Sequence, residues 1–380
     1  MALNYKTRIG NQLLRCGITT GSCAALAASA AAYCLLTGEK PSVVKLLTPK
    51  GIPVETVPEC WKETKDSVSC AVRKDAGDDP DVTNGLLIFA RVWKTADGIV
   101  ITGGEGIGRV TKPGLDQPVG EAAINSVPRR MIREAAQAVC AGEQYFGGLK
   151  IEISAPGGQA IAEKTFNPML GIQGGISILG TSGIVEPMSE QALVDTIAVE
   201  ARQIAESGEK RVILAPGNYA VEFLHQHLPD LAKVPLLKCS NYIGETIDIA
   251  CVNSFQEVLL VGHIGKIVKL AGGIMNTHSR MADCRAELLC AHAAVCGAGT
   301  ELCQKLMRQV TTEACLSLLQ QEALLPNVME SLLNRIQDHL NRRAEGAFSI
   351  GAVMFSNTCG LLGSTQTAKA LLGKWSGSCV

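Results

Sequence analysis

The residues best suited to chemistry lie in the glycine-rich segment 262–283, "GHIGKIVKLAGGIMNTHSRMAD". It contains two histidines, His263 and His278, and two lysines, Lys266 and Lys269. The lysines are three residues apart, so on a helix they would share one face and could bind carboxylates together. A single histidine is most often structural, but two imidazoles in so polar a stretch favour a general base at one of them. The alternative is that the lysines form a solvated helix face.

Two further segments carry hydroxyl and backbone groups that suit an anion. A helix expected over 19–36 begins at Thr19, Thr20 and Gly21 with no acid in its first turn, where unpaired N–H groups could bind an anion. Thr181 and Ser182 follow an apolar strand-like run, and the same donors recur there. Ordinary threonine capping is the alternative at the first site. A nucleophilic serine is the alternative at the second, although the G-x-S-x-G pattern is absent.

The loop 103–115, "GGEGIGRVTKPGL", is rich in glycine but matches no phosphate motif. Its glycines at 104, 106 and 108 are one residue short of the dinucleotide spacing, and the Gly265-Lys266 pair lies outside any Walker sequence. Backbone N–H groups beside Lys112 could bind a carboxylate as well as a phosphate. If the loop lines a substrate cleft, Gly106→Val should lower turnover more than stability. If it is a plain hairpin, the loss should be chiefly in folding.

The loop 74–85, "KDAGDDPDVTNG", places Asp75, Asp78, Asp79 and Asp81 close together. Four carboxylates on one turn repel one another unless positive charge lies near. The pattern predicts either a divalent-cation loop or a loop that binds nitrogen groups of a ligand, and it differs from the EF-hand pattern. The alternative is a solvated turn with capping aspartates.

Composition narrows the class of protein. The 380 residues are 47% hydrophobic, with 35 basic and 36 acidic side chains and 15 cysteines. Near-zero net charge argues against general nucleic-acid binding. An odd number of cysteines without a Cys-x-x-Cys pair indicates reduced cytosolic thiols.

Neither a metal site nor a membrane span is predicted. Cys284, Cys290 and Cys296 are six residues apart and would not share a helix face, so they would not bind one metal ion together. The longest apolar helical run, about 14 residues, is shorter than a membrane span of roughly 20. We therefore expect a soluble cytoplasmic protein without membrane contacts.

The pattern of expected helices and strands changes near residue 187. Short strand-like runs and a helix over 119–142 predict an α+β domain with a mixed sheet for residues 1–187. A helix over 189–208 and three strand-turn-helix units then predict a Rossmann-like α/β domain with a parallel sheet for 188–380. The sequence does not assign the tail, about 340–380, to either domain. Ligands of such sheets bind where the strands end. A nucleoside-type ligand is therefore expected at the following residues: Gly217, Asn218, Asn241, Gly262 and Gly265.

Seven motifs in order resemble one known family. They are "RCGITTGSCAA", "KDAGDDPDVTNG", "GGEGIGRVTKPGL", "GEAAINSVPRRMI", "GISILGTSGIVEPMS", "PGNYA" and "GHIGKIVKLAGGIMNTHS". In these the chain resembles the CbiD family, the cobalt-precorrin-5B C-1 methyltransferases of anaerobic cobalamin synthesis, from about residue 15 to 285. It departs from the family pattern at Cys16, Ser126 and Ala220, none of which is an expected ligand.

The resemblance implies methyl transfer from S-adenosylmethionine to C-1 of cobalt-precorrin-5B, giving cobalt-precorrin-6A. Cobalt would arrive inside the substrate, so no protein metal site is implied. His263 or His278 would act as base if a ring proton leaves. The substrate carries many carboxylates, and the residues expected to bind it are Thr19, Thr20, Gly21, Asp75, Asp78, Asp79, Gly104, Glu105, Gly106, Lys112, Arg129, Thr181, Ser182, Lys266 and Lys269.

Two other classes of protein stay open at this point. A hydrolase or deacylase could use Ser182 or Thr20 as its nucleophile, and a non-catalytic scaffold could protect an unstable corrinoid. Neither would need S-adenosylmethionine, so binding of that molecule separates them from a methyltransferase. A homo-oligomer is compatible with the sequence.

Overall fold

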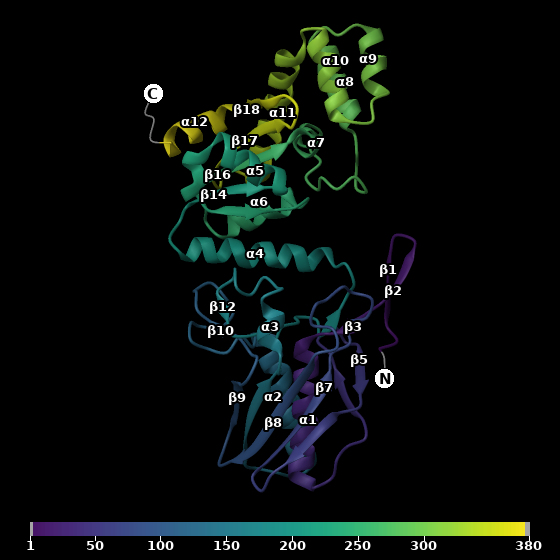
Figure 1. Cartoon of the computed structure of the whole chain (residues 1–380), viewed down its shortest axis with the longest axis vertical. Coiled ribbons are helices and arrows are strands. Elements are labelled where there is room, and N and C mark those ends of the chain that lie inside the picture. The colour runs from purple at the N-terminus through teal and green to yellow at the C-terminus, as the bar shows by residue number, and fades with distance from the viewer. Residues whose placement is uncertain (1–2, 377–380) are drawn as a thin grey trace. The chain divides into compact units, whose positions relative to one another are not determined.

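The computed structural model describes residues 3–376 and divides the chain into two compact units. The first unit is Met1–Glu190 and the second is Gln191–Val380. Both combine helices with sheets (Figure 1), and each contains a five-stranded sheet with parallel and antiparallel pairs. The expected combination of helices with sheets is confirmed, as is the mixed sheet expected in the first part of the chain. The sheet of the second unit, expected to be parallel, is also mixed, because its last strand runs antiparallel. The two units are described separately below.

The core of the first unit is built around helix α1 (Thr20–Thr37). Its alanines and cysteines are almost fully buried, because small side chains let neighbouring elements approach closely. Helix α2 (Ser126–Gly142) and strands β7 (Ser67–Arg73) and β8 (Leu87–Thr95) pack against it. Within residues 3–376, α1 is the one helix long and apolar enough to cross a membrane by length and composition, and 72% of it is buried in this core.

The sheet of the first unit has the strand order β6-β7-β8-β11-β9. All neighbours are antiparallel except β9 and β11, which run parallel. Along β8, buried side chains alternate with more exposed ones, so one face of the sheet packs on α1. The other strands of this sheet are β6 (Glu59–Glu63), β9 (Ile99–Gly103) and β11 (Gly148–Ser154).

Short pairings complete the first unit. Strand β3 pairs with β13, and this pairing joins the start of the chain to its segment near residue 184. Helix α2 begins only at Ser126, with Asn125 extended before it and Pro128 in its first turn, where proline is tolerated. The remaining elements are β1 (Lys6–Ile9), β2 (Gln12–Arg15), β3 (Gly17–Ile18), β4 (Val44–Leu47), β5 (Pro53–Thr56), β10 (Arg109–Val110), β12 (Ile172–Gln173), β13 (Ile184–Val185) and α3 (Gly158–Ala162).

The second unit contains a sheet of order β15-β14-β16-β17-β18. The first four strands are parallel, and β18 returns antiparallel to β17. The strands are β14 (Arg211–Ala215), β15 (Leu236–Lys238), β16 (Glu257–His263), β17 (Ser349–Ser356) and β18 (Gly360–Ser364). Most residues of β14, β16 and β17 are buried, because apolar clusters pack against this sheet.

Helices connect and cover these strands (Figure 1). They are α4 (Glu190–Glu206), α5 (Asn218–His227), α6 (Ile243–Val252), α7 (Ile264–Ile267), α11 (Leu325–Ala344) and α12 (Gln366–Trp375), with 3₁₀ turns η1 (Pro229–Lys233) and η2 (Val268–Gly272). Three more helices, not predicted from the sequence, form a lobe that packs on η2 and α11 and shares their hydrophobic core. They are α8 (Arg285–Val295), α9 (Thr300–Met307) and α10 (Thr312–Gln321). The tail segment after α11 supplies β17 and β18 to the sheet.

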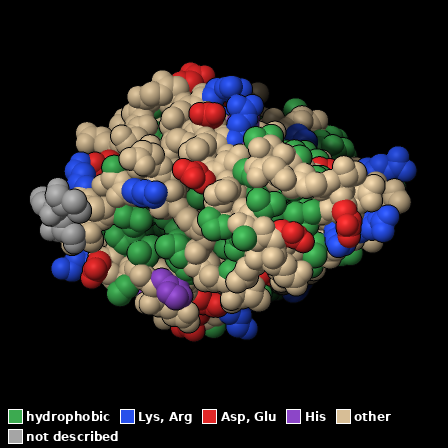
Figure 2. All heavy atoms as spheres, turned by 90° about the horizontal axis from the view of Figure 1, so that it is seen from above, with side chains coloured by type: hydrophobic (Ala, Val, Ile, Leu, Met, Phe, Trp, Pro, Cys, Tyr) green, Lys and Arg blue, Asp and Glu red, His purple; other side chains and the backbone are tan. Residues whose placement is uncertain are grey.

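Charged side chains are distributed over the surface without a dominant sign. On the face drawn in Figure 2, Lys and Arg side chains are interspersed with Asp and Glu, and apolar side chains form small groups between them. A formal net charge of −1 is consistent with this distribution.

The glycine-rich loop between β9 and β10 is part of the packing of the first unit. Gly106 has φ +70°, and a Cβ atom there would lie 1.9 Å from the carbonyl oxygen of Ala155. The backbone of Gly106 also accepts a hydrogen bond from Ile176 N–H. These contacts favour the alternative considered for this loop, in which its glycines serve the fold.

We therefore predict that Gly106→Val chiefly destabilises the protein. Gly120→Val is a matched control, because Gly120 has φ +92° but open space where a Cβ would lie. Both variants suffer backbone strain of about 1–3 kcal/mol, and only Gly106→Val adds a steric clash costing about 1–3 kcal/mol more. The measurement is the free energy of unfolding in urea. Equal losses in the two variants would contradict the packing argument.

Candidate functional site

The parallel strands of the second unit end at one common edge, which we call the carboxyl edge. Strands β14, β15, β16 and β17 run parallel, so their ends converge where ligands of such sheets bind. The turns at these strand ends, counted from the last strand residue for β16 and β17, are 216–218, 239–241, 263–265 and 356–358. Four of the expected cofactor residues belong to these turns: Gly217, Asn218, Asn241 and Gly265. The fifth, Gly262, is buried, and a Cβ there would lie 2.6 Å from Ile267.

Lys266 connects two of these strand ends. Its ammonium donates to the carbonyl oxygen of Pro216 and, at 3.2 Å, to that of Ser240. Burial lowers the pKa of Lys266. An ammonium has three N–H donors, so one remains for a further partner. Among the residues that the structure describes, no carboxylate lies within ion-pair distance of it.

Lys269 does not share a cationic face with Lys266. Its side chain is 2% exposed, and its ammonium donates to the carbonyl oxygens of Thr277 at 3.1 Å and Ala282 at 2.8 Å. Asp283 lies 3.8 Å away. Lys269 therefore anchors the segment 277–283, because its chain is buried and its charge is satisfied by the loop that returns over it.

His263 belongs to a hydrogen-bonded cluster that joins three elements. Its Nδ1 accepts from Gly265 N–H at 3.1 Å, and its Nε2 lies 3.1 Å from Oε1 of Glu313 on α10. The other carboxylate oxygen of Glu313 accepts from the hydroxyl of Ser356 at 2.8 Å and from that of Thr358. Burial raises the pKa of Glu313, but these hydroxyls and His263 outweigh it and lower the pKa overall.

The cluster fixes the tautomer of His263. Since Nδ1 accepts a backbone N–H, the proton of the neutral ring lies on Nε2 and is donated to Glu313. The ring consequently has no unused lone pair in this arrangement. Two aromatic rings flank it: that of Tyr219, 60% exposed, at 6.0 Å between centroids, and that of Phe355 at 5.7 Å.

His278 lies at the same edge and is more exposed than His263. Its neighbour Thr277 donates its N–H to the carbonyl oxygen of Asn241, in the turn that follows β15. The side chain of His278 is exposed, and its Nδ1 accepts from Arg280 N–H at 3.0 Å. Of the two histidines, His278 is therefore the one accessible to a ligand.

In the first unit, the start of α1 is occupied by the protein's own groups. Thr19 caps the helix and donates its N–H to Gly183, while Gly21 N–H donates to Leu179 at 3.0 Å. The hydroxyl of Thr20 accepts from Leu179 N–H at 3.0 Å. The donors expected to hold an anion are thus bonded to the segment 179–183, which favours the capping alternative.

The two hydroxyl residues of that segment differ in exposure. Thr181 is exposed. Ser182 is half-buried, and its hydroxyl donates to the carbonyl oxygen of Ile184 and accepts from the same residue's N–H. Ser182 therefore closes a local turn, whereas Thr181 remains accessible.

Basic side chains neutralise two carboxylates of the acidic loop. The guanidinium of Arg15 binds both oxygens of Asp75, at 2.5 and 2.9 Å. This hydrogen-bonded pairing lowers the pKa of Asp75 despite its partial burial. The ammonium of Lys74, with 2% of its side chain exposed, binds Asp81. These contacts provide the positive charge that the clustered carboxylates require.

The other two carboxylates accept backbone donors. Asp78 accepts from Arg15 N–H at 2.6 Å, and Asp79 accepts from Met188 N–H at 3.0 Å. All four aspartates thus have partners within the protein, and the loop ties residues 15 and 188 to β7. The contacts favour a structural role over a cation-binding one.

Arg129 has a comparable structural role. Its guanidinium donates to three backbone carbonyl oxygens, at 2.8–3.3 Å, and burial lowers its pKa. Near the glycine-rich loop, Glu105 is exposed, and exposed Lys112 reaches the carbonyl oxygen of Met169 at 3.3 Å. A Cβ on Gly104 would lie 3.1 Å from the side chain of Glu152. Glu105 and Lys112 are therefore accessible charges of this region, as is the exposed Arg109.

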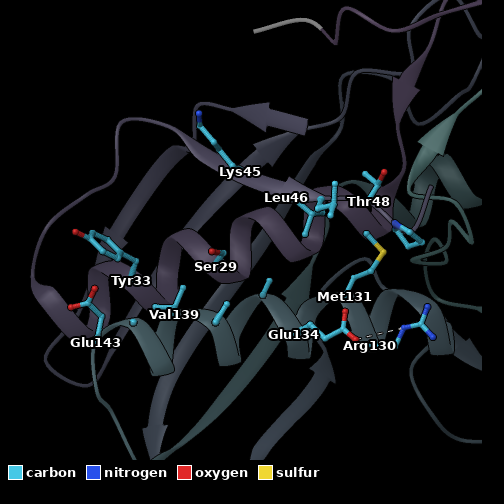
Figure 3. A pocket seen from close by; sticks show the side chains of 15 residues that line it. Ser29, Tyr33, Lys45, Leu46, Thr48, Arg130, Met131, Glu134, Val139 and Glu143 are labelled. Carbon is cyan, nitrogen blue, oxygen red and sulfur yellow. Dashed lines mark ion pairs between the residues drawn. The ribbon is translucent and has the colours of Figure 1, made fainter. Parts of the chain in front are cut away.

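A groove of about 720 Å³ lies in the first unit between α1, α2 and the β4 region. Figure 3 shows Tyr33 and Ser29 on α1, Lys45 on β4, and Arg130 ion-paired with Glu134 along α2. Its floor is apolar, while its charged residues are of both signs. No function was predicted for these residues from the sequence.

The comparisons with known proteins define the family. The model of the CbiD family matches residues 7–187, and the model of the CbiD C-terminal domain matches residues 276–366. The chain belongs to the CbiD family.

Particular relatives carry one name. The chain is 51% identical over 346 residues to the cobalt-precorrin-5B C(1)-methyltransferase of Ruminiclostridium cellulolyticum, covering 90% of this chain and 89% of that protein. It is 43% identical over 361 residues to the enzyme of the same name from Alkaliphilus metalliredigens, covering 94% of each. The crystal structure of the cobalamin biosynthesis protein cbiD from Archaeoglobus fulgidus is 29% identical, covers 74% of this chain and 87% of that one, and has a TM-score of 0.40.

Three residues of the His263 cluster were missed from the sequence: Glu313, Ser356 and Thr358. Glu313 lies 50 residues beyond His263, on a helix without a recognisable motif. Ser356 and Thr358 could have been found, because "SNT" follows an apolar strand as the other carboxyl-edge turns do.

We predict that Asp81→Asn destabilises the first unit far more than Asp79→Asn. The substitution at Asp81 leaves the buried Lys74 ammonium without its counter-ion, at a cost of about 3 kcal/mol, the lower end of the usual range because Asp81 is 24% exposed. Asp79 loses only part of a contact with a backbone N–H. The measurement is the free energy of unfolding at neutral pH. Similar losses for both variants would show that Lys74 is satisfied without Asp81.

The same pair predicts a pH dependence. Burial raises the pKa of Asp81, but the charge of Lys74 and hydrogen bonds from Lys74 and Thr83 lower it overall below 3.8. A carboxyl whose pKa is lowered in the folded state stabilises it above the unfolded value, and this contribution is lost as pH falls through the lower folded value. The stability difference between wild type and Asp81→Asn should therefore shrink as pH falls below 3.8. A difference independent of pH in thermal unfolding would contradict this assignment.

Proposed function

We propose that this chain transfers a methyl group from S-adenosylmethionine to C-1 of cobalt-precorrin-5B, giving cobalt-precorrin-6A in anaerobic cobalamin synthesis. The observation that carries the proposal is the membership of the CbiD family, with a relative of that name 51% identical across nine-tenths of both chains. The substrate would be a small corrinoid that brings its own cobalt, and the methyl donor a co-substrate. The place of action would be the cytoplasm.

The methyl donor would bind at the carboxyl edge. Under this proposal residues 188–380 form a Rossmann-like domain, and the turns containing Gly217, Asn218, Asn241 and Gly265 hold the donor. The support is the four parallel strands that end there and the partly exposed polar groups that surround those ends. Gly262 would contribute by packing against Ile267.

Residues 1–187 would form a second domain that takes part in corrinoid binding. Of the groups expected there, Asp78, Glu105, Lys112 and Thr181 are exposed. Asp78 accepts a hydrogen bond from the backbone of Arg15, and the other three remain available to contact the substrate. Asp78 and the other expected residues of this domain have internal partners, so their contribution would be to hold the loops in shape. They are Thr19, Thr20, Gly21, Asp75, Asp78, Asp79, Gly104, Gly106, Arg129 and Ser182.

The reaction asks mainly for alignment. The nucleophilic ring carbon displaces the neutral thioether from the sulfonium methyl, so no proton has to reach the leaving group. Holding the two reactants in line, about 3–3.5 Å apart, supplies most of the acceleration. If a proton leaves the ring, His278 is the better base, because it is exposed while both nitrogens of His263 are engaged.

The hydrolase alternative has weak support in the geometry. Thr20 is buried, and the hydroxyl of Ser182 is bonded to Ile184. Within residues 3–376, neither hydroxyl has a histidine as a hydrogen-bond partner. A serine or threonine nucleophile needs an adjacent base, so the methyltransferase proposal is preferred.

Calorimetric titration with S-adenosylhomocysteine, followed by an assay with S-adenosylmethionine and cobalt-precorrin-5B, tests the proposal. We expect binding of the nucleoside and a methylated corrinoid product. A chain that bound the corrinoid but neither nucleoside would instead be a scaffold. Hydrolysis of the corrinoid without the methyl donor would identify a hydrolase.

We predict that His278→Gln lowers kcat by about 100-fold to 10,000-fold, the usual contribution of a general base. The thermal midpoint should change little, because the side chain is exposed. His225→Gln, at an exposed position on α5, is the matched control and should retain activity. If His278→Gln turns over at the wild-type rate, the base is not His278.

A further inference from the structure

Two side chains of opposite charge lie at the carboxyl edge without a permanently charged partner. Among residues 3–376, the hydrogen-bond partners of the Lys266 ammonium are the carbonyl oxygens of Pro216 and Ser240. Glu313 accepts from His263, Ser356 and Thr358, and its side chain is 29% exposed. Within residues 3–376, His263 is the one basic side chain within ion-pair distance of Glu313, and a neutral ring satisfies its observed hydrogen bonds. Both charges are therefore available to a ligand.

The strand order sets the spacing of these two charges. Lys266 lies across the ends of β15 and β14, and Glu313 lies against the ends of β16 and β17. In the order β15-β14-β16-β17, the centres of the two pairs are two strand spacings apart, which is roughly 10 Å.

A zwitterion has matching dimensions. The ammonium nitrogen and carboxylate oxygens of an α-amino acid are about 3 Å apart, by ordinary bond lengths. Charge-assisted hydrogen bonds of about 2.8 Å at either end give a total span of roughly 8–9 Å. A ligand with an α-amino acid group can thus bridge the two side chains, with small adjustments of the lysine.

We infer that Lys266 and Glu313 bind the α-amino acid end of S-adenosylmethionine. Lys266 binds the carboxylate of the ligand, and Glu313 binds the ammonium group of the ligand. This inference rests on the proposed function and goes beyond it by assigning the two ends of the methyl donor. His263, Ser356 and Thr358 are then positioning residues, since they orient the carboxylate of Glu313 without contacting the ligand. The sequence predicted that Lys266 binds the corrinoid substrate, and this inference assigns it to the methyl donor instead.

The charge pattern distinguishes the zwitterionic end of the methyl donor from the carboxylate arms of the corrinoid. A carboxylate arm of a corrinoid would be attracted by Lys266 but repelled by Glu313 nearby. A zwitterion is attracted by both. The pair therefore favours the amino acid end of the methyl donor over a substrate carboxylate.

Calorimetric titration with two nucleosides tests the inference in the full chain. S-adenosylhomocysteine carries the amino acid group, and 5′-methylthioadenosine is the matching neutral thioether without it. We expect wild type to bind the first at least about tenfold more tightly, since each charge-assisted contact is a substantial part of the affinity. Lys266→Met and Glu313→Gln should each remove most of this preference. Glu313→Gln should leave the affinity for 5′-methylthioadenosine unchanged. Lys266→Met also loses the contacts of the lysine with Pro216 and Ser240, so it should weaken both nucleosides, and S-adenosylhomocysteine the more.

Matched variants control for charge alone. Glu301 and Lys305 form an exposed i,i+4 ion pair on α9, so Glu301→Gln and Lys305→Met change the same charges in the same unit. Both should bind the two nucleosides as wild type does. Lys266→Arg, which keeps the charge, should retain part of the preference for S-adenosylhomocysteine.

Five outcomes would overturn the inference. Equal wild-type affinity for the two nucleosides, or an unchanged preference in both variants, would reject the zwitterion site while leaving the methyl donor in place. Equal loss of both nucleosides in the variants would make Lys266 and Glu313 structural. Weakened corrinoid binding in Lys266→Met with intact S-adenosylhomocysteine binding would assign the lysine to the substrate. Failure of wild type to bind either nucleoside would reject the proposed function as well.

Discussion

One ammonium group holds the ends of two neighbouring strands in the second unit. The carbonyl oxygens of Pro216 and Ser240 lie beyond the hydrogen-bond ladder of β14 and β15, and Lys266 donates to both. Ser240 has φ +52°, a left-handed conformation that is uncommon for a residue with a side chain. The lysine therefore stabilises a strained turn at the place where the parallel sheet offers a ligand site. The geometry of the carboxyl edge depends on this contact.

A cluster of polar residues has different consequences in the two units. In the first unit, the aspartates of the acidic loop and the hydroxyls at the start of α1 bind segments distant in the chain. Their hydrogen-bonding capacity is used by the fold. At the carboxyl edge of the second unit, the hydrogen-bonding capacity of Lys266 and Glu313 is only partly used by the fold. Polar clusters whose side chains all have partners within the protein are thus structural, whereas clusters with unused donors or acceptors are candidate sites.

The helical lobe α8–α10 is connected to the sheet by the cluster around Glu313. Glu313 lies in the first turn of α10 and accepts hydrogen bonds from the ends of β16 and β17. A displacement of the lobe would therefore move the carboxylate away from the edge. A methyl transfer that depends on alignment benefits from such fixed anchoring, since the reactants have to be held to within a fraction of an ångström.

The sequence by itself determined the local elements and the family. Buried alternation along β8, the small residues of α1 and the apolar strands β14, β16 and β17 follow from hydrophobic period and size. The order of the motifs indicated the family, and the strand-end rule indicated the edge at which the expected turns of β14, β15 and β16 meet. These properties are local or ordered along the chain, so they can be recognised without the folded structure.

The tertiary structure alone decided which polar groups are used by the fold and which stay available. Arg15 meets Asp75 across 60 residues, and Glu313 meets His263 across 50. The sequence predicted that Lys266 and Lys269 share one helix face. In the structure Lys266 has a free donor at the carboxyl edge, whereas Lys269 is buried beneath the segment 277–283. The physical reason is that a charge is paired or unpaired by neighbours in space, and no period of the sequence encodes those neighbours.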